Sequence, residues 1–166
     1  MSLPRLFTLL LAFVPVLASA ARDVSYHADP VSCTSGPYAL KLPESYEALK
    51  KLGSLRAERV LPAGARREAS IEQRELSFHG LRLLIQRNAA DAGNYRVLSA
   101  DISNGSWKIA GPFRVGAALP GRVGDVDTKG LSGRGIVEFI GDSNDLVRIR
   151  RSGRRVSTIT YLCHIE

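Results

Sequence analysis

The chain has 166 residues, with 23 Lys and Arg against 16 Asp and Glu and a formal net charge of +7 at pH 7. This length suits one domain or two small packed repeats, and it allows a buried core without a dense disulfide framework. Of the basic residues, 18 are Arg and five are Lys. Guanidinium groups bind carboxylates and phosphates in a bidentate manner, so this bias favours anionic partners, although a GC-rich genome produces the same bias.

The first twenty residues have the order of a secretory signal: Arg5, an apolar run over residues 6–17, and small residues at 18–20. The alternative, a membrane span, needs about 20 apolar residues, and this run has about 12. We therefore expect cleavage near Ala20-Ala21 and a periplasmic or secreted protein without a membrane span. Because no cysteine follows the cut, we expect no lipid anchor.

The two cysteines, Cys33 and Cys163, lie near opposite ends of the mature chain. An oxidising compartment favours pairing of two lone thiols, so the sequence predicts a disulfide between them. Such a bridge closes a loop of roughly 130 residues, to which the chain-entropy model assigns about 4–5 kcal/mol as an upper value. The alternative is two unrelated buried thiols.

The best predicted helix covers Leu42–Gly53. Pro43 lies at its start, acidic residues follow in the first turn, lysines lie in the last turn, and glycine ends it. Tyr46, Leu49 and Leu52 recur at a spacing that places them on one face. We expect this face to pack on a sheet.

Three predicted strands follow the helix, over Ile71–Phe78, Leu81–Arg87 and Tyr95–Ile102. His79-Gly80 reads as a two-residue hairpin turn, because glycine tolerates a positive φ. In the second strand Leu81, Leu83 and Ile85 alternate with Arg82, Leu84 and Gln86, a pattern typical of a half-buried strand.

A second group of three predicted strands covers Ile136–Ile140, Leu146–Arg151 and Arg154–Cys163, and turn-forming residues separate the three. Phe113–Gly124 precedes this group in the place that the helix has in the first half. Proline and glycine interrupt that segment, so we expect a short or irregular connection.

The pattern predicts an α+β fold of two tandem units. Each unit has a leading strand, a helical or irregular connection and a three-strand antiparallel meander. After the signal (1–20) and an N-terminal segment (21–37), we expect the first repeat at 38–106 and the second at 107–166, packed as one globular unit. The alternative is an ordinary small α+β protein, since such proteins commonly contain meanders.

Three segments carry a resemblance to a known architecture: Leu42–Gly53, Phe113–Gly116 and the hairpin Val147–Val156. Together they resemble the tandem-repeat secreted β-lactamase inhibitor proteins and the related single-repeat assembly lipoproteins of the SmpA/OmlA type. The resemblance spans most of 38–163, and it implies a strand, a helix-loop-helix and a meander per unit. The second half lacks a credible helix pair, and the lipid-attachment cysteine of the lipoproteins is absent. No binding motif of those families matches, so no contact residue is carried over.

Histidines and loop acids are the candidates for catalysis or metal binding. His27, His79 and His164 lie far apart in the sequence. Only His27 and His164 come near each other through the expected disulfide, which removes the thiols that would bind metal. The loop Asp142-Ser143-Asn144-Asp145 lacks the ligand spacing of a dedicated calcium loop and favours a solvated turn. We predict no catalytic residue, no metal and no cofactor.

The most unusual feature of the second half is a basic hairpin. In a strand Arg148 and Arg150 project to the same side, and we expect Arg155 to join them across the hairpin. One interpretation is that the group forms a patch that binds an acidic partner. The other is that it forms a solvated sheet face that prevents the sheet edge from pairing with another chain. Its members are Arg148, Arg150, Arg151, Arg154 and Arg155. The single Trp107 lies between the halves and is expected to anchor the core rather than a partner.

These observations predict an exported, non-enzymatic binding protein. The expected partner is a protein, acidic where it meets the basic hairpin, and we expect no nucleic-acid partner outside the cytoplasm. An inhibitor or immunity protein that blocks an envelope or secreted hydrolase fits best. One alternative is an envelope assembly factor that binds an outer-membrane protein or peptidoglycan. Another is an enzyme of unrecognised type, since a small fold can host chemistry that sequence motifs do not show. The sequence does not determine the oligomeric state.

Overall fold

The computed structural model describes residues 23–62, 70–91, 93–131 and 135–164. The predicted signal and its cleavage point lie outside these residues. The described chain is mostly β, with one eight-stranded sheet, one two-stranded hairpin and one five-residue helix. A sheet-dominated fold is therefore established. No helix among the described residues is long and apolar enough to cross a membrane.

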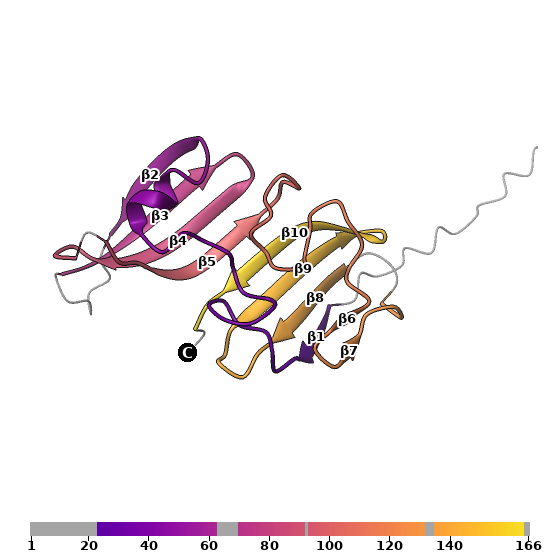
Figure 1. The fold of residues 1–166 in the computed structure, drawn as a ribbon. Coiled ribbons are helices and arrows are strands. Elements are labelled where there is room, and N and C mark those ends of the chain that lie inside the picture. Colours follow the sequence, from indigo (N-terminus) through magenta and orange to yellow (C-terminus); the bar gives the residue numbers. More distant parts are fainter. Residues whose placement is uncertain (1–22, 63–69, 92, 132–134, 165–166) are drawn as a thin grey trace, which may run out of the picture.

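The eight strands form a single mixed sheet (Figure 1). In spatial order they are β1 (Val24–His27), β8 (Gly135–Ile140), β9 (Leu146–Ser152), β10 (Arg155–Leu162), β5 (Arg96–Ile102), β4 (Leu81–Asn88), β3 (Ile71–Phe78) and β2 (Leu55–Leu61). All neighbours are antiparallel except β1 and β8. The two predicted meanders are β3–β4–β5 and β8–β9–β10, and they meet where β5 pairs with β10.

Both predicted meanders are confirmed, and each strand boundary lies within one residue of its expected place. The turn at His79-Gly80 is also present, with Gly80 at a φ of +70°. Two strands of the large sheet, and the short strands β6 (Arg122–Val123) and β7 (Val126–Asp127), were not predicted. β2 adds a fourth strand to the first meander, and β1 adds a parallel strand to the second.

The helix α1 covers Tyr46–Lys50, so the predicted Leu42–Gly53 was too long at both ends. Ser45 explains where the helix begins, because its hydroxyl accepts a hydrogen bond from the Ala48 amide and satisfies an otherwise free donor. Tyr46 and Leu49 are buried, as the predicted apolar face requires.

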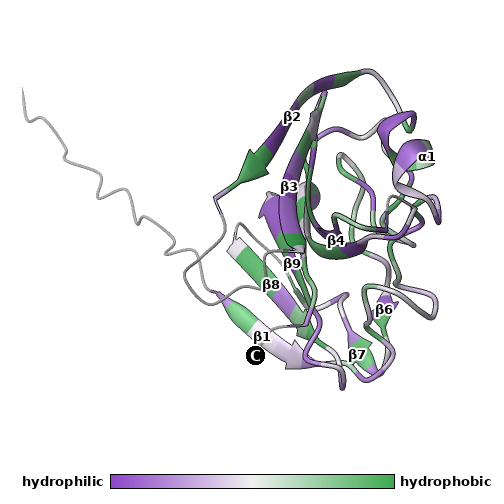
Figure 2. Ribbon diagram, turned by 90° about the vertical axis from the view of Figure 1, so that its left-hand side faces the viewer, coloured by the Kyte–Doolittle hydropathy of each residue, from purple (hydrophilic) through white to green (hydrophobic). Residues whose placement is uncertain are grey.

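One face of the sheet is covered. Figure 2 shows α1 and the hairpin of β6 (Arg122–Val123) and β7 (Val126–Asp127) on the same side of the sheet. The core lies between these elements and the sheet, where Phe113 stacks on Phe139 with ring centroids 6.1 Å apart. The segment before β6 is irregular, as predicted.

Trp107 also lies on the covered side and packs against the core, as predicted. Its indole N–H donates to the His79 carbonyl at 2.8 Å, and its ring meets the Phe78 ring edge to face. The indole therefore ties the loop between the two meanders to the β3–β4 turn.

The predicted disulfide is present: Cys33 and Cys163 are bonded, and both are buried. Asp145 reinforces the junction. Its carboxylate accepts hydrogen bonds from the Cys33 amide at 2.7 Å and the His164 amide at 2.8 Å. Burial alone would raise the pKa of Asp145, but these amides and the hydroxyls of two neighbouring serines lower it below its usual value. The solvated-turn interpretation was therefore wrong for Asp145, which is 1% exposed.

Candidate functional site

No described element lies over the second face of the sheet, where a row of polar side chains runs from strand to strand. Residues opposite each other on neighbouring strands point to the same face. The strand registers place one such row across seven strands, from β1 to β3. We call it the polar row: Ser25, Glu138, Arg148, Thr160, Asp101, Arg82 and Ser77.

Within the polar row all four charged side chains are paired. Arg148 donates to Glu138 at 2.6 Å, and Ser25 donates to the same carboxylate at 2.9 Å. The hydrogen bond from Arg148 is the main cause of a lowered pKa of Glu138. Asp101 accepts hydrogen bonds from Thr160 at 2.8 Å and from Arg82 at 2.9 Å. The carboxylates thus hold two arginines and a threonine in fixed positions.

An apolar row lies beside the polar row on the same face. The registers connect Ile140 to Leu146, Leu146 to Leu162, and Leu162 through Ser99 to Leu84. Leu146 is buried yet lies outside the main core cluster, while the other three apolar residues are half-buried. This face therefore combines apolar area with charged and hydroxyl groups, as the surfaces that bind proteins do.

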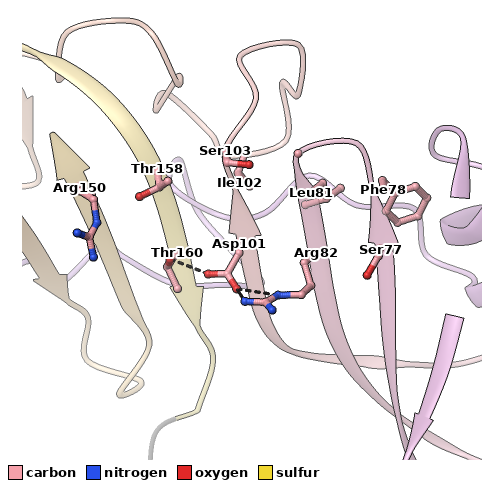
Figure 3. A pocket seen from close by; sticks show the side chains of 11 residues that line it. Ser77, Phe78, Leu81, Arg82, Asp101, Ile102, Ser103, Arg150, Thr158 and Thr160 are labelled. Carbon is pink, nitrogen blue, oxygen red and sulfur yellow. Dashed lines mark hydrogen bonds and ion pairs between the residues drawn. The ribbon is translucent and has the colours of Figure 1, made fainter. Parts of the chain in front are cut away.

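A hollow of about 490 Å³ opens where the two meanders meet. Figure 3 shows its side chains, with Asp101 between Thr160 and Arg82 and with Arg150 on the far side of β10. Hydroxyl groups supply the rest of its polar lining, from Ser77, Ser103, Thr158 and Thr160.

The hollow carries a net positive charge. Asp101 neutralises Arg82, whereas no described residue pairs with the guanidinium of Arg150, which is exposed. Two cations and one carboxylate leave one formal positive charge. An anionic group that entered the hollow would meet a free guanidinium flanked by hydroxyl donors.

The structure divides the predicted basic hairpin between two faces. Arg148 and Arg150 project from the uncovered face, as expected, and the residues across the hairpin from them are Thr160 and Thr158. The prediction that Arg155 joins them is therefore wrong, because Arg155 lies opposite Ser152 and donates to the Gly116 carbonyl at 2.6 Å.

The remaining two arginines also lie apart from the hollow. Arg151 alternates with Arg150 and therefore projects to the covered face, where it donates to the Leu131 carbonyl. Arg154 lies in the turn beside it, after Gly153. Of the five arginines, only Arg150 lines the hollow.

The histidines do not meet one another. The structure brings His27 to Asp29 and Asp142, with its Nε2 3.1 Å and 3.0 Å from their carboxylate oxygens. All three side chains are exposed, and the contact with Asp142 is a hydrogen bond. Nothing in the described part of the chain adds a buried ligand to this group, and it carries no argument for a metal.

Comparison with family models, with curated proteins and with solved structures finds no match for this chain. The resemblance to inhibitor proteins and assembly lipoproteins stays a prediction. The functional argument therefore rests on the uncovered face and its hollow.

Proposed function

We propose that the protein is an exported, non-enzymatic binding protein that docks a protein partner on the uncovered face of the sheet. An inhibitor or immunity protein acting on an envelope or secreted hydrolase is the function that fits best. The observation that carries this proposal is the hollow between the meanders, in which Arg150 is exposed beside hydroxyl groups and apolar area.

The composition of the face supports a protein partner. Arginine contributes strongly to protein interfaces when it is desolvated at the centre of the contact. Arg150 has a central place, because the hollow lies at the β5–β10 junction and the rows extend to both sides. Its complement is a partner carboxylate, which would form a charge-assisted hydrogen bond with it.

Export and the tandem arrangement belong to the same proposal. A buried disulfide is typical of proteins that fold outside the cytoplasm and so supports export. Two meanders of three strands, each extended by one more strand, support the proposal of two tandem units. The strand order differs from the expected tandem arrangement at β1, because this strand lies in the N-terminal segment and pairs with the second meander.

The experiment is site-specific crosslinking in the native envelope. A photoreactive amino acid at Thr158, inside the hollow, should capture one protein in stoichiometric yield. The same label at Ser106, exposed in the loop between the meanders, should not. If the captured protein is a hydrolase, adding the purified protein at a one-to-one ratio should stop its turnover.

Charge reversal supplies the control. Arg150→Glu should weaken the complex at least tenfold, as expected for loss of a charge-assisted hydrogen bond of about 1.5–3 kcal/mol. Arg122→Glu makes the same charge change on the covered side and should bind normally. Capture of an outer-membrane protein or of peptidoglycan would select the assembly role instead. Equal binding by both variants would contradict docking at the hollow.

A further inference from the structure

A second, smaller cavity lies on the opposite side of the sheet from the hollow, between the β9–β10 turn and the loop around β6 and β7. Its volume is about 280 Å³. Backbone and small or apolar side chains of 118–131 form its walls. Three cationic side chains also line it: Lys129, Arg151 and Arg154.

Each cation reaches the cavity for a local reason. Arg151 projects to the covered face because it alternates with Arg150. Arg154 follows the tight turn at Gly153, whose φ is +64°. Lys129 follows β7, and its backbone amide donates to the Asp127 carboxylate at 2.9 Å, which fixes the start of that loop.

The carboxylate of Asp127 binds the Lys129 backbone amide, and no ion pair holds any of the three cationic side chains within the described chain. None of them forms an ion pair with a described carboxylate, and no Asp or Glu lines the cavity. Arg151 donates from Nη1 to the Leu131 carbonyl, but its Nε is buried without a described acceptor. Like charges gathered around one open cavity repel each other, and an anion bound between them would reduce this repulsion.

We infer that this cavity binds a phosphate-sized oxyanion, of the class of phosphomonoesters. Three cations on different segments suit a tetrahedral dianion better than a carboxylate, which presents two oxygens in one plane and a single charge. The volume of about 280 Å³ leaves room for a phosphate and a small attached group. The inference does not depend on the proposed protein partner, because the two cavities share no residue.

Calorimetric titration of the mature protein with inorganic phosphate tests the site. At pH 7.5 and low salt we expect a dissociation constant below about 1 mM. Lys129→Glu and Arg154→Glu should each weaken binding at least tenfold, and Arg154→Lys should keep most of it. Lys108→Glu is the matched control, because Lys108 is exposed in the loop between the meanders and does not line the cavity. This variant should bind phosphate as the parent protein does. Both target residues are exposed, so the urea midpoint should stay unchanged.

Two further arms identify the source of the phosphate. Soluble glycerol phosphate should bind at least as tightly as phosphate. If the ligand is a soluble phosphomonoester, the protein should bind vesicles that contain phosphatidic acid no better than neutral vesicles. If the ligand is a lipid headgroup, the protein should bind the phosphatidic acid vesicles better and should still bind glycerol phosphate. The inference is overturned if neither phosphate nor glycerol phosphate binds, or if Lys108→Glu loses as much affinity as Lys129→Glu.

Discussion

The two ends of the sheet are held to their covering segments by different means. In the first meander Arg74 joins Glu58 and Glu72 by hydrogen bonds, and Tyr46 of α1 donates to Glu58. In the second, the disulfide and Asp145 attach the N-terminal segment to β9 and β10. The first end depends on side-chain charges, and the second on one covalent bond and a buried carboxylate.

The comparison also separates structural arginines from candidates for binding. The guanidinium of Arg74 is satisfied by two carboxylates, and Arg87 lies over the Tyr46 ring at 4.5 Å. Arg150 and Arg154 have no such partners among the described residues. An arginine whose guanidinium pairs with groups of the same chain stabilises the fold, whereas an unpaired guanidinium beside a cavity is available to a ligand.

The largest expected effect is loss of the disulfide. In Cys33→Ser/Cys163→Ser the unfolded chain regains freedom over 130 residues, and the free energy of unfolding should fall by about 2–5 kcal/mol. Urea unfolding measures the change. All strands share the loss of global stability in hydrogen exchange, but β1 should lose more protection than β3 and β4, because β1 lies at the opposite edge of the sheet and next to the missing bridge. Equal loss across all strands would contradict two separately fastened ends.

Asp145→Asn is expected to have the next largest effect, about 2–3 kcal/mol, because an amide cannot accept from both backbone donors as a carboxylate does. The pH dependence gives the sharper test. The lowered pKa means that the stabilisation is complete above the usual value of 3.8 and is lost as pH falls through the folded value. The difference between parent and variant should therefore shrink below about pH 4. A constant difference down to pH 2 would argue against the ionised carboxylate.

Arg74→Met tests the first end. The change leaves Glu58 and Glu72 partly buried without their common partner, and unfolding free energy should fall by about 1–2 kcal/mol. Arg59→Met removes a guanidinium from the exposed neighbouring position on β2 and should change stability by less than about 0.5 kcal/mol. If the two variants unfold alike in urea, the carboxylate pairing does not fasten α1 to this end.

Much of the sheet could be predicted from local sequence, and the missed strands show why some could not. Alternation and a glycine turn determine β3 and β4, and Gly80 has the positive φ that such a turn needs. β2 carries charges on both faces and exposes Val60, because it is an edge strand with one neighbour. β1 is only four residues long and depends on a parallel partner more than 100 residues away.

The candidate site was only half predictable for the same reason. Alternation places Arg148 and Arg150 on one side of β9, and the sequence shows it. The hollow also needs Asp101 and Arg82, which reach it only because β5 pairs with β10. That pairing joins strands about 60 residues apart in the chain, and no local pattern specifies it.

The smallest expected effect on stability is that of Arg150→Ala, and it sharpens the comparison most. Because no described residue pairs with the exposed guanidinium, its loss should change the free energy of unfolding by less than about 0.5 kcal/mol. Arg82→Ala, on the same face, leaves Asp101 with only the Thr160 hydrogen bond and should cost slightly more, up to about 1 kcal/mol. Urea midpoints of the two variants measure the order. A cost for Arg150→Ala equal to that of Arg74→Met would make Arg150 a structural residue and remove the argument for a binding hollow.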